Sequence, residues 1–137
     1  MRYLIDTNVL INIVEENESL PHDVQAIRDD YENIIYVSSE SIKEFIHLVQ
    51  ESRITLKKEF RTLDVFYLIE NTLGFNVKFV AKEHLRTFTT LNLVEGHTDP
   101  SDRLIIAQAI TEKMPLISSD KKFPKYRKMG LELIVSR

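Results

Sequence analysis

Four carboxylates lie where predicted strands end or where the helices after them begin. Asp6 directly follows the first predicted strand and Asp120 the fourth, whereas Glu44 and Asp102 each fall in the first turns of a predicted helix. In open α/β sheets, ligands bind at the carboxyl ends of the strands. The helices that follow these strands start at the same edge, so we expect the four acids to share one pocket.

A pocket of this kind needs a cation. Crowded carboxylates repel one another, and one or more of them takes up a proton unless positive charge is supplied. Oxygen ligands select hard cations such as Mg²⁺ or Mn²⁺. The chain has no cysteine and no pair of histidines at metal-ligand spacing, which argues against zinc. We therefore predict a Mg²⁺ or Mn²⁺ site for one or two ions, of the type that most often handles phosphates.

Each acid also has a simpler structural explanation. Asp6 can cap the helix that follows it, and Asp120 can be an ordinary turn residue. The segment Ser41-Ile42-Lys43-Glu44 matches a capping box. Asp99, a fifth candidate, fits the N-cap of a helix with proline at its first position, where Asp102 favours the helix dipole. None of these explanations accounts for the gathering of all the acids at one edge.

Other active-site motifs are absent or incomplete. A phosphoaspartyl phosphatase needs Asp-x-Asp after the first strand, whereas this chain has Asp6-Thr7-Asn8 and lacks the second acid. The sequence contains no P-loop and no G-x-S-x-G nucleophile elbow. Its four histidines lie in unrelated contexts, which argues against a metal-free ribonuclease with a histidine pair. Only His97 is close to the acids, where we expect a turn or a supporting role beside the ligands.

Predicted strands and helices alternate along the chain. The apolar runs predict strands at residues 3–5, 34–37, 76–80, 116–118 and 131–135. The periodicity predicts helices at residues 9–14, 21–32, 40–51, 60–73, 83–92 and 100–113. This alternation indicates an α/β fold in which a parallel sheet of four or five strands has helices on both faces. We expect one domain over residues 1–137, with the helix from Pro100 at its centre.

Two helical stripes are expected to face the core, because an apolar stripe must be buried against another element. They comprise Val24, Ile27 and Tyr31 in one helix and Phe60, Leu63 and Tyr67 in another.

Composition excludes a membrane protein and leaves nucleic acid open. The longest apolar run has five residues, 65–69, whereas a membrane-spanning helix needs roughly 20. With no secretory segment and no cysteine, we expect a cytoplasmic protein. The formal net charge is −3, but residues 121–137 hold six basic residues against one acid, which gives +5. Setting aside the four site acids leaves 18 basic against 17 acidic residues, so the net charge does not exclude nucleic acid.

Four segments resemble a PIN domain, and more narrowly the VapC-type toxins of bacterial toxin–antitoxin pairs. They are Leu4-Ile5-Asp6-Thr7-Asn8-Val9-Leu10, Ser38-x-x-Ser41-x-x-Glu44-Phe45, His97-Thr98-Asp99-Pro100-Ser101-Asp102-Arg103-Leu104-Ile105-Ile106-Ala107-Gln108-Ala109 and Leu116-Ile117-Ser118-Ser119-Asp120. The third segment is the specific one, and the resemblance spans nearly the whole chain. It implies a PIN-like three-layer αβα sandwich around a parallel sheet.

The resemblance implies a set of metal-binding, catalytic acids. These are Asp6, Glu44, Asp102 and Asp120. Asp99 belongs to a subgroup pattern, either as a fifth ligand or as a cap. Two departures from the family pattern remove no carboxylate. Ser101 stands where the family often has Phe, which we expect to open the pocket slightly, and the fourth strand ends in Ser118-Ser119-Asp120 rather than Thr-x-Asp.

The same resemblance implies supporting residues around the acids. Thr7 or Asn8 would hold the surroundings of the first acid, and Ser118 would hydrogen-bond the site. Arg103 would bridge a carboxylate or the scissile phosphate, with an intrahelical ion pair as the alternative. The cluster Lys121 to Lys128 is a candidate contact for the RNA backbone, with a solvated loop as its alternative.

The function implied is a Mg²⁺- or Mn²⁺-dependent endoribonuclease. Water attacks phosphorus and leaves a 5′-phosphate and a 3′-hydroxyl. The implied partners are RNA, a second copy in a homodimer, and a small antitoxin in a groove walled by the helices around Phe45 and Phe60 to Leu73. The alternatives are a housekeeping PIN nuclease in RNA processing and a non-catalytic PIN binding module. The presence of all four acids argues against the binding module.

Overall fold

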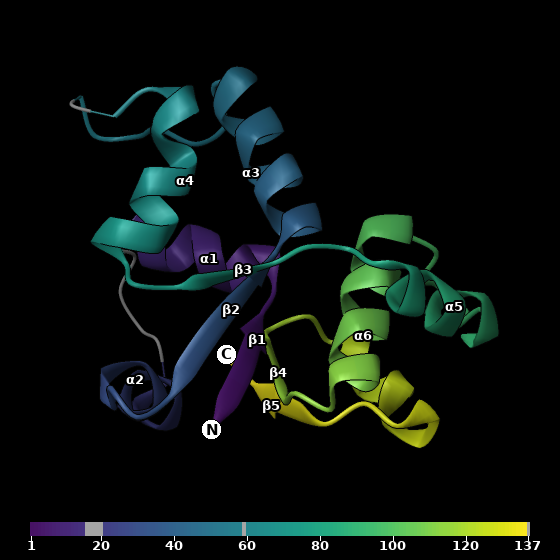
Figure 1. Cartoon of the computed structure of the whole chain (residues 1–137). Coiled ribbons are helices and arrows are strands. Elements are labelled where there is room, and N and C mark those ends of the chain that lie inside the picture. The colour runs from purple at the N-terminus through teal and green to yellow at the C-terminus, as the bar shows by residue number, and fades with distance from the viewer. Residues whose placement is uncertain (16–20, 59, 137) are drawn as a thin grey trace.

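The centre of the fold is a five-stranded sheet whose strands all run parallel, in the order β3-β2-β1-β4-β5 (Figure 1). The computed structural model describes residues 1–15, 21–58 and 60–136. The strands are β1 (Arg2–Ile5), β2 (Ile34–Ser38), β3 (Asn76–Lys78), β4 (Leu116–Ser118) and β5 (Leu133–Val135). The predicted parallel sheet is confirmed, and it has five strands.

The helices follow the predicted order with shifted ends. They are α1 (Thr7–Val14), α2 (His22–Asp29), α3 (Ser39–Gln50), α4 (Val65–Tyr67), α5 (Lys82–Thr90) and α6 (Pro100–Glu112), with η1 (Thr62–Asp64), η2 (Leu68–Thr72) and η3 (Phe123–Met129) as shorter helical turns. Among these described helices, none is both long and apolar enough to cross a membrane.

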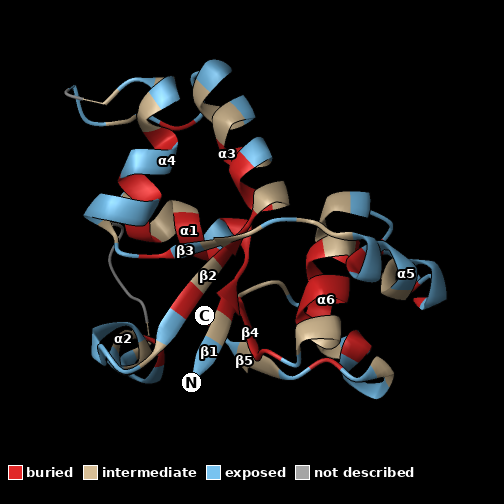
Figure 2. Ribbon diagram, in the orientation of Figure 1, coloured by how far each residue is buried: buried red, intermediate tan, exposed pale blue. Residues whose placement is uncertain are grey.

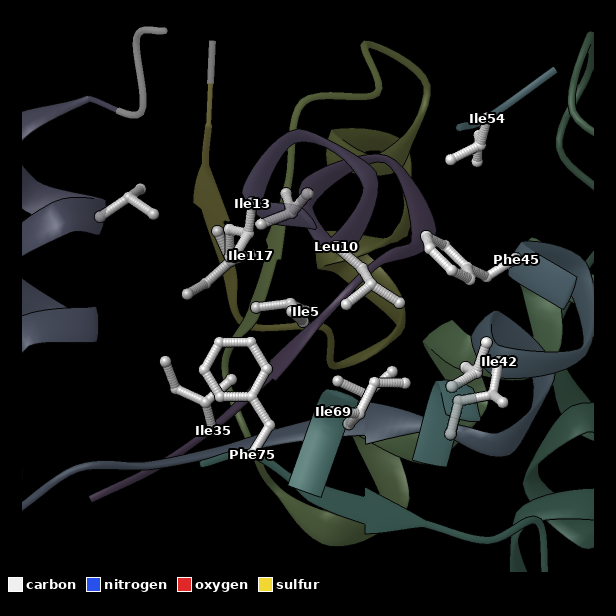
Figure 3. Close-up of a cluster of buried hydrophobic side chains, with 14 residues drawn as sticks. Ile5, Leu10, Ile13, Ile35, Ile42, Phe45, Ile54, Ile69, Phe75 and Ile117 are labelled. Atoms are coloured by element: carbon white, nitrogen blue, oxygen red, sulfur yellow. The ribbon is translucent and has the colours of Figure 1, made fainter. Parts of the chain in front are cut away.

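Helices cover both faces of the sheet, as predicted, and each face has its own core. Successive side chains of a strand point to opposite faces. Ile5 and Ile117 therefore pack with α1, α3 and η2, in the cluster of Figure 3. Leu4 and Leu116, one position earlier in the same strands, pack with α6 and η3. Buried residues follow the central strands and continue into α6, so α6 lies at the core as expected (Figure 2).

The strand order reverses between β1 and β4. The chain moves from β1 to β2 and β3 on one side, and then returns to β4 and β5 on the other. Crevices at the carboxyl ends of strands form at such a switch point, because the connections on the two sides diverge. This sheet therefore has its natural ligand position directly after β1 and β4.

The two predicted core stripes are wrong in part. Tyr31 is 94% exposed because α2 ends at Asp29, before the stripe is complete. The segment 62–72 passes from 3₁₀ through α to π geometry, so one period of 3.6 residues does not hold along it. Leu63 and Tyr67 are consequently 71% and 61% exposed. The buried face consists instead of Val65, Leu68 and Ile69.

Two alanine substitutions in this segment should have very different effects. Ile69 is 1% exposed, so Ile69→Ala should lower the free energy of unfolding by about 2–5 kcal/mol through lost burial and a cavity. Leu63→Ala removes an exposed side chain and should change it by less than about 0.5 kcal/mol. Urea denaturation of both variants measures the difference. Equal losses would contradict the buried face described here.

Candidate active site

Ser118 joins two of the predicted site acids at the switch point. Its hydroxyl donates to Oδ2 of Asp6 at 2.5 Å and accepts the backbone N–H of Asp120 at 3.0 Å. Asp6 follows β1 and Asp120 follows β4, so this one side chain fixes the ends of two neighbouring strands against each other. The structure thus places Ser118 where the sequence analysis expected it, beside the acids.

Asp6 is both a helix cap and a member of the acidic cluster. Its Oδ1 accepts the N–H of Val9 at 2.9 Å and caps α1, while its Oδ2 accepts from Ser118. The side chain is 3% exposed. The next residue, Thr7, donates its hydroxyl to the hydroxyl oxygen of Ser41 at 3.1 Å and links α1 to α3. Asn8 is exposed on α1.

The capping-box explanation of Glu44 is wrong. Helix α3 begins at Ser39, and its N-cap is Ser38, whose hydroxyl accepts the N–H of Glu40 at 3.0 Å. Glu44 therefore lies more than a turn inside the helix, half-buried, where it has no capping task. Its negative charge acts on Asp102 and raises the pKa of that carboxyl.

Asp99 caps α6, as its structural explanation predicted. It is exposed, and its Oδ1 accepts the N–H groups of Ser101 at 2.9 Å and Asp102 at 3.4 Å. Its charge nevertheless reaches the site, because it raises the pKa of Asp102. Whether Asp99 also binds a metal stays a prediction.

Burial and mutual repulsion make the cluster electrostatically unfavourable. Burial, followed by the charges of Asp102 and Asp120, raises the pKa of Asp6 to about 6, although its bonds to Ser118 and Val9 oppose the shift. Burial and the charge of Asp99 raise the pKa of Asp102 to about 6 as well, against the opposing effect of His97. The site therefore concentrates more negative charge than its own hydrogen bonds balance.

The donor atoms fit a hard divalent cation. One ligand atom each from His97, Asp102 and Asp120 lies within 4.8 Å of the others, and the charges of these two acids act on Asp6. The carboxylates supply oxygen ligands, which Mg²⁺ and Mn²⁺ prefer. Nε2 of His97 already contacts Oδ2 of Asp102 at 3.3 Å, so the acids are the natural ligands.

Arg103 points away from the acids. Its Nη2 donates to the carbonyl oxygen of Leu91 at 3.0 Å, and its guanidinium lies over the ring of Phe88 at 5.0 Å. Within the described ranges, no carboxylate lies within ion-pair distance of it, so neither the expected carboxylate bridge nor its alternative, an intrahelical ion pair, is formed there. Arg103 instead sits beside the Tyr126 hydroxyl and lowers its pKa against the larger effect of burial.

Ser101 lies at the entrance side of the cluster. Its hydroxyl is 3.4 Å from Oε1 of Glu40, and it borders a hollow of about 360 Å³ together with Lys43, Glu44 and His47. A small side chain at this position leaves the approach to Glu44 open.

Tyr126 is the residue near the site that the sequence analysis missed. Its hydroxyl lies 2.6 Å from Nδ1 of His97, and both residues are buried. Tyr126 stands outside all four family-like segments, in a stretch that was noted only for its basic residues. A buried aromatic at that position gives no periodic signal, so only the fold brings it to His97.

A second group of metal-ligand types, Glu83, His84 and Glu112, is structural. Nδ1 of buried His84 accepts the N–H of Ala81 at 2.9 Å, and Nε2 lies 2.7 Å from Glu112. Both ring nitrogens are therefore used within the protein. The hydrogen bond from His84, with the charges of Lys78 and Arg2, lowers the pKa of Glu112. This cluster ties α5 and α6 to the sheet.

The chain belongs to the PIN domain family, because the family model described as "PIN domain" matches residues 3–129. No curated protein sequence matches it significantly.

Among solved structures, the chain is similar to VapBC proteins. The chain in VapBC2 from Rickettsia felis, bound to a DNA fragment from its promoter, superimposes with a TM-score of 0.68 at 17% identity over 98% of both chains. DNA-bound VapBC from Salmonella typhimurium gives 0.69 at 14% identity, again over 98% of both. VapBC-5 from Mycobacterium tuberculosis, a member of a family of toxin-antitoxin systems, gives 0.61 at 18% identity over 98% of both. These likenesses confirm the predicted PIN-like fold.

The raised pKa of Asp6 predicts a pH dependence of stability in the metal-free protein. The carboxyl has a pKa of about 6 in the fold against an ordinary value of 3.8, so between these values the folded state holds a proton that the unfolded state has lost. The free energy of unfolding must then fall as pH rises through this range. Asp6→Asn should remove the part of that fall due to Asp6, on the order of 3 kcal/mol at about 1.4 kcal/mol per pKa unit.

Urea denaturation from pH 4 to 7.5 in EDTA measures this difference. Glu32→Gln, which neutralises an exposed carboxylate away from the site, is the control and should follow the wild type. An Asp6→Asn curve parallel to the wild type would contradict the raised pKa.

Proposed function

We propose that this chain is a Mg²⁺- or Mn²⁺-dependent endoribonuclease, the toxin component of a type II toxin–antitoxin pair. The convergence of carboxylates at the switch point of a PIN fold carries the proposal. One serine contacts both Asp6 and Asp120. The charges of Asp102 and Asp120 raise the pKa of Asp6, and those of Asp99 and Glu44 raise the pKa of Asp102. A fold with only a binding role has no reason to bury this uncompensated charge.

The acids Asp6, Glu44, Asp102 and Asp120 are the proposed ligands, with Asp99 as a possible fifth. A bound divalent ion supplies Lewis acidity, which lowers the pKa of water and neutralises charge on phosphate oxygens. Ser118 keeps Asp6 and Asp120 in fixed positions, and the acids together orient water toward phosphorus. We propose that the products carry a 5′-phosphate and a 3′-hydroxyl, because an acidic centre of this kind does not need the RNA 2′-hydroxyl as nucleophile.

An exposed apolar surface is the proposed seat of an antitoxin. It consists of Leu63, Phe66 and Tyr67, and Phe66 also borders a hollow of about 430 Å³ over α3 together with Ile42 and Ile46. Contiguous apolar surface of this kind marks a protein interaction site. The similar VapBC structures support a protein partner for this chain. Phe45, an expected wall of the groove, is fully buried and lies among the core residues of Figure 3 instead.

The proposed RNA contact lies beside His97. Lys125, Arg127 and Lys128 of η3 line a hollow of about 470 Å³ whose other wall is residues 92–95. The part of η3 nearest the site is anchored by Tyr126, whose hydroxyl meets His97. A basic surface on the same short helix as Tyr126 is suited to contact RNA phosphates. We further propose that the protein works in the cytoplasm as a homodimer.

Cleavage of a mixed structured RNA pool tests the nuclease. The purified chain with Mg²⁺ or Mn²⁺ should produce cuts with 5′-phosphate ends. EDTA should abolish cleavage. Asp6→Asn and Asp120→Asn should each reduce it by at least about 100-fold, because each removes one charged ligand and so weakens the binding of the metal ion. Glu32→Gln, a neutralised acid outside the site, should cleave like the wild type.

Three results would contradict the proposal in different ways. Cleavage that resists EDTA would exclude the metal. Equal behaviour of Asp6→Asn and wild type in every assay would favour the non-catalytic binding module. Cleavage without growth arrest on expression would favour the housekeeping nuclease over the toxin.

Removal of one basic side chain tests the RNA contact. Lys125 lies on η3, where its Nζ is 3.5 Å from the carbonyl oxygen of Glu95. Lys125→Gln should weaken binding of single-stranded RNA to an Asp6→Asn background several-fold, and lower the salt slope by about 0.7 if it neutralises one phosphate. Lys113→Gln is the matched control, because Lys113 is exposed at the end of α6, before β4 begins. Equal loss in both variants would contradict this surface.

A further inference from the structure

Tyr126 and Asp102 contact the two nitrogens of the same imidazole. The Tyr126 hydroxyl lies 2.6 Å from Nδ1 of His97, and Oδ2 of Asp102 lies 3.3 Å from Nε2. The His97 ring is held edge-on by Phe123 and Tyr126, with centroid distances of 5.5 and 5.4 Å. His97 and Tyr126 are buried, so water does not compete for the contact between them, whereas the side chain of Asp102 is partly exposed. The direction of the two hydrogen bonds therefore has to be settled by the protein groups themselves.

With Asp102 ionised, only one arrangement of hydrogens satisfies every group. If Nδ1 accepts from the Tyr126 hydroxyl, Nε2 carries the hydrogen and donates it to Asp102. If Nδ1 carries the hydrogen instead, the Nε2 lone pair faces a carboxylate oxygen. If both nitrogens carry hydrogens, the Tyr126 hydroxyl hydrogen loses its acceptor, and the described residues offer it no other. A buried donor without an acceptor is costly.

Arg103 favours the same direction. The positive charge of Arg103 acts on the Tyr126 hydroxyl and opposes the rise of its pKa, which favours this hydroxyl as the donor to His97. The carbonyl oxygen of Leu91 and the ring of Phe88 hold Arg103 in this place. The chain of donors thus runs from Tyr126 through His97 to Asp102.

We propose that Tyr126 is a positioning residue, which holds His97 in the tautomer whose Nε2–H donates to Asp102. This bond engages Oδ2 of Asp102 and thereby fixes the orientation of the carboxylate. Its other oxygen, Oδ1, has no hydrogen-bond partner among the described residues. The inference rests on the proposed function, in which Asp102 binds a cation and therefore has to be held in one orientation. The tautomer itself is a property of the metal-free protein.

Two measurements test the role. In uniformly ¹⁵N-labelled, EDTA-treated protein, long-range ¹H–¹⁵N correlations should show the Nε2–H tautomer of His97, whose signals are assigned by their loss in His97→Gln. Tyr126→Phe keeps the ring but removes the hydroxyl, so this tautomer should lose its dominance. The Mn²⁺ dissociation constant should rise about 10-fold or more, as for other residues that orient a ligand.

Tyr31→Phe is the matched control, because Tyr31 is highly exposed and precedes β2 at the opposite edge of the sheet. It should leave both the tautomer and the Mn²⁺ affinity unchanged. An Nδ1–H tautomer in the wild type would overturn the proposal even if Tyr126→Phe failed to fold. Unchanged tautomer and unchanged affinity in a folded Tyr126→Phe would also overturn it. An Nε2–H tautomer that depends on Tyr126, in a protein that binds no Mn²⁺, would support the positioning and refute the proposed metal site.

Discussion

The constraint on which this structure depends is the repulsion among buried carboxylates at the point where the strand order reverses. The sheet brings Asp6 and Asp120 together because β1 and β4 are neighbours, and Ser118 holds them at that separation. Burial of Asp6 carries a cost that the hydrogen bonds from Val9 and Ser118 reduce without removing. The surrounding helices must therefore supply rigid positions, since repelling groups would otherwise move apart.

Hydrogen bonds from the helix termini provide much of that rigidity. Asp6 caps the helix that follows it with one oxygen and meets Ser118 with the other, so its capping and clustering roles are compatible rather than alternative. Asp99 uses its side chain to begin α6 and so fixes the turn that carries Asp102. On the far side of the cluster, Tyr126 and His97 add a contact from η3. Elements from four separate parts of the chain meet at the site.

Much of the fold and the site was predictable because both depend on short-range patterns. The apolar runs that end at Asp6 and Asp120 indicate buried parallel strands, and the location of acids after them follows from strand direction. The capping box predicted at Glu44 was wrong. The Ser-x-x-Glu spacing is met by Ser41 and Glu44, but the helix already begins three residues earlier, after its N-cap Ser38. Tyr126 and the orientation of Arg103 were beyond prediction, since both depend on how η3 and α5 pack against α6. The stripe around Leu63 failed because helix geometry changes within eleven residues.

The central position of β1 also determines when the acidic centre can exist. β1 is synthesised first among the strands, yet its partner β4 comes after more than one hundred further residues, and the contact between Asp6 and Ser118 spans 112 positions. Long-range parallel pairing forms late, because the closure entropy of the intervening chain must be overcome before the contacts form. A growing polypeptide that has not yet reached β4 can hold Asp6, Glu44 and Asp102, but it still lacks Ser118 and Asp120. The acidic centre therefore stays incomplete until synthesis has passed Asp120 and β4 has paired with β1.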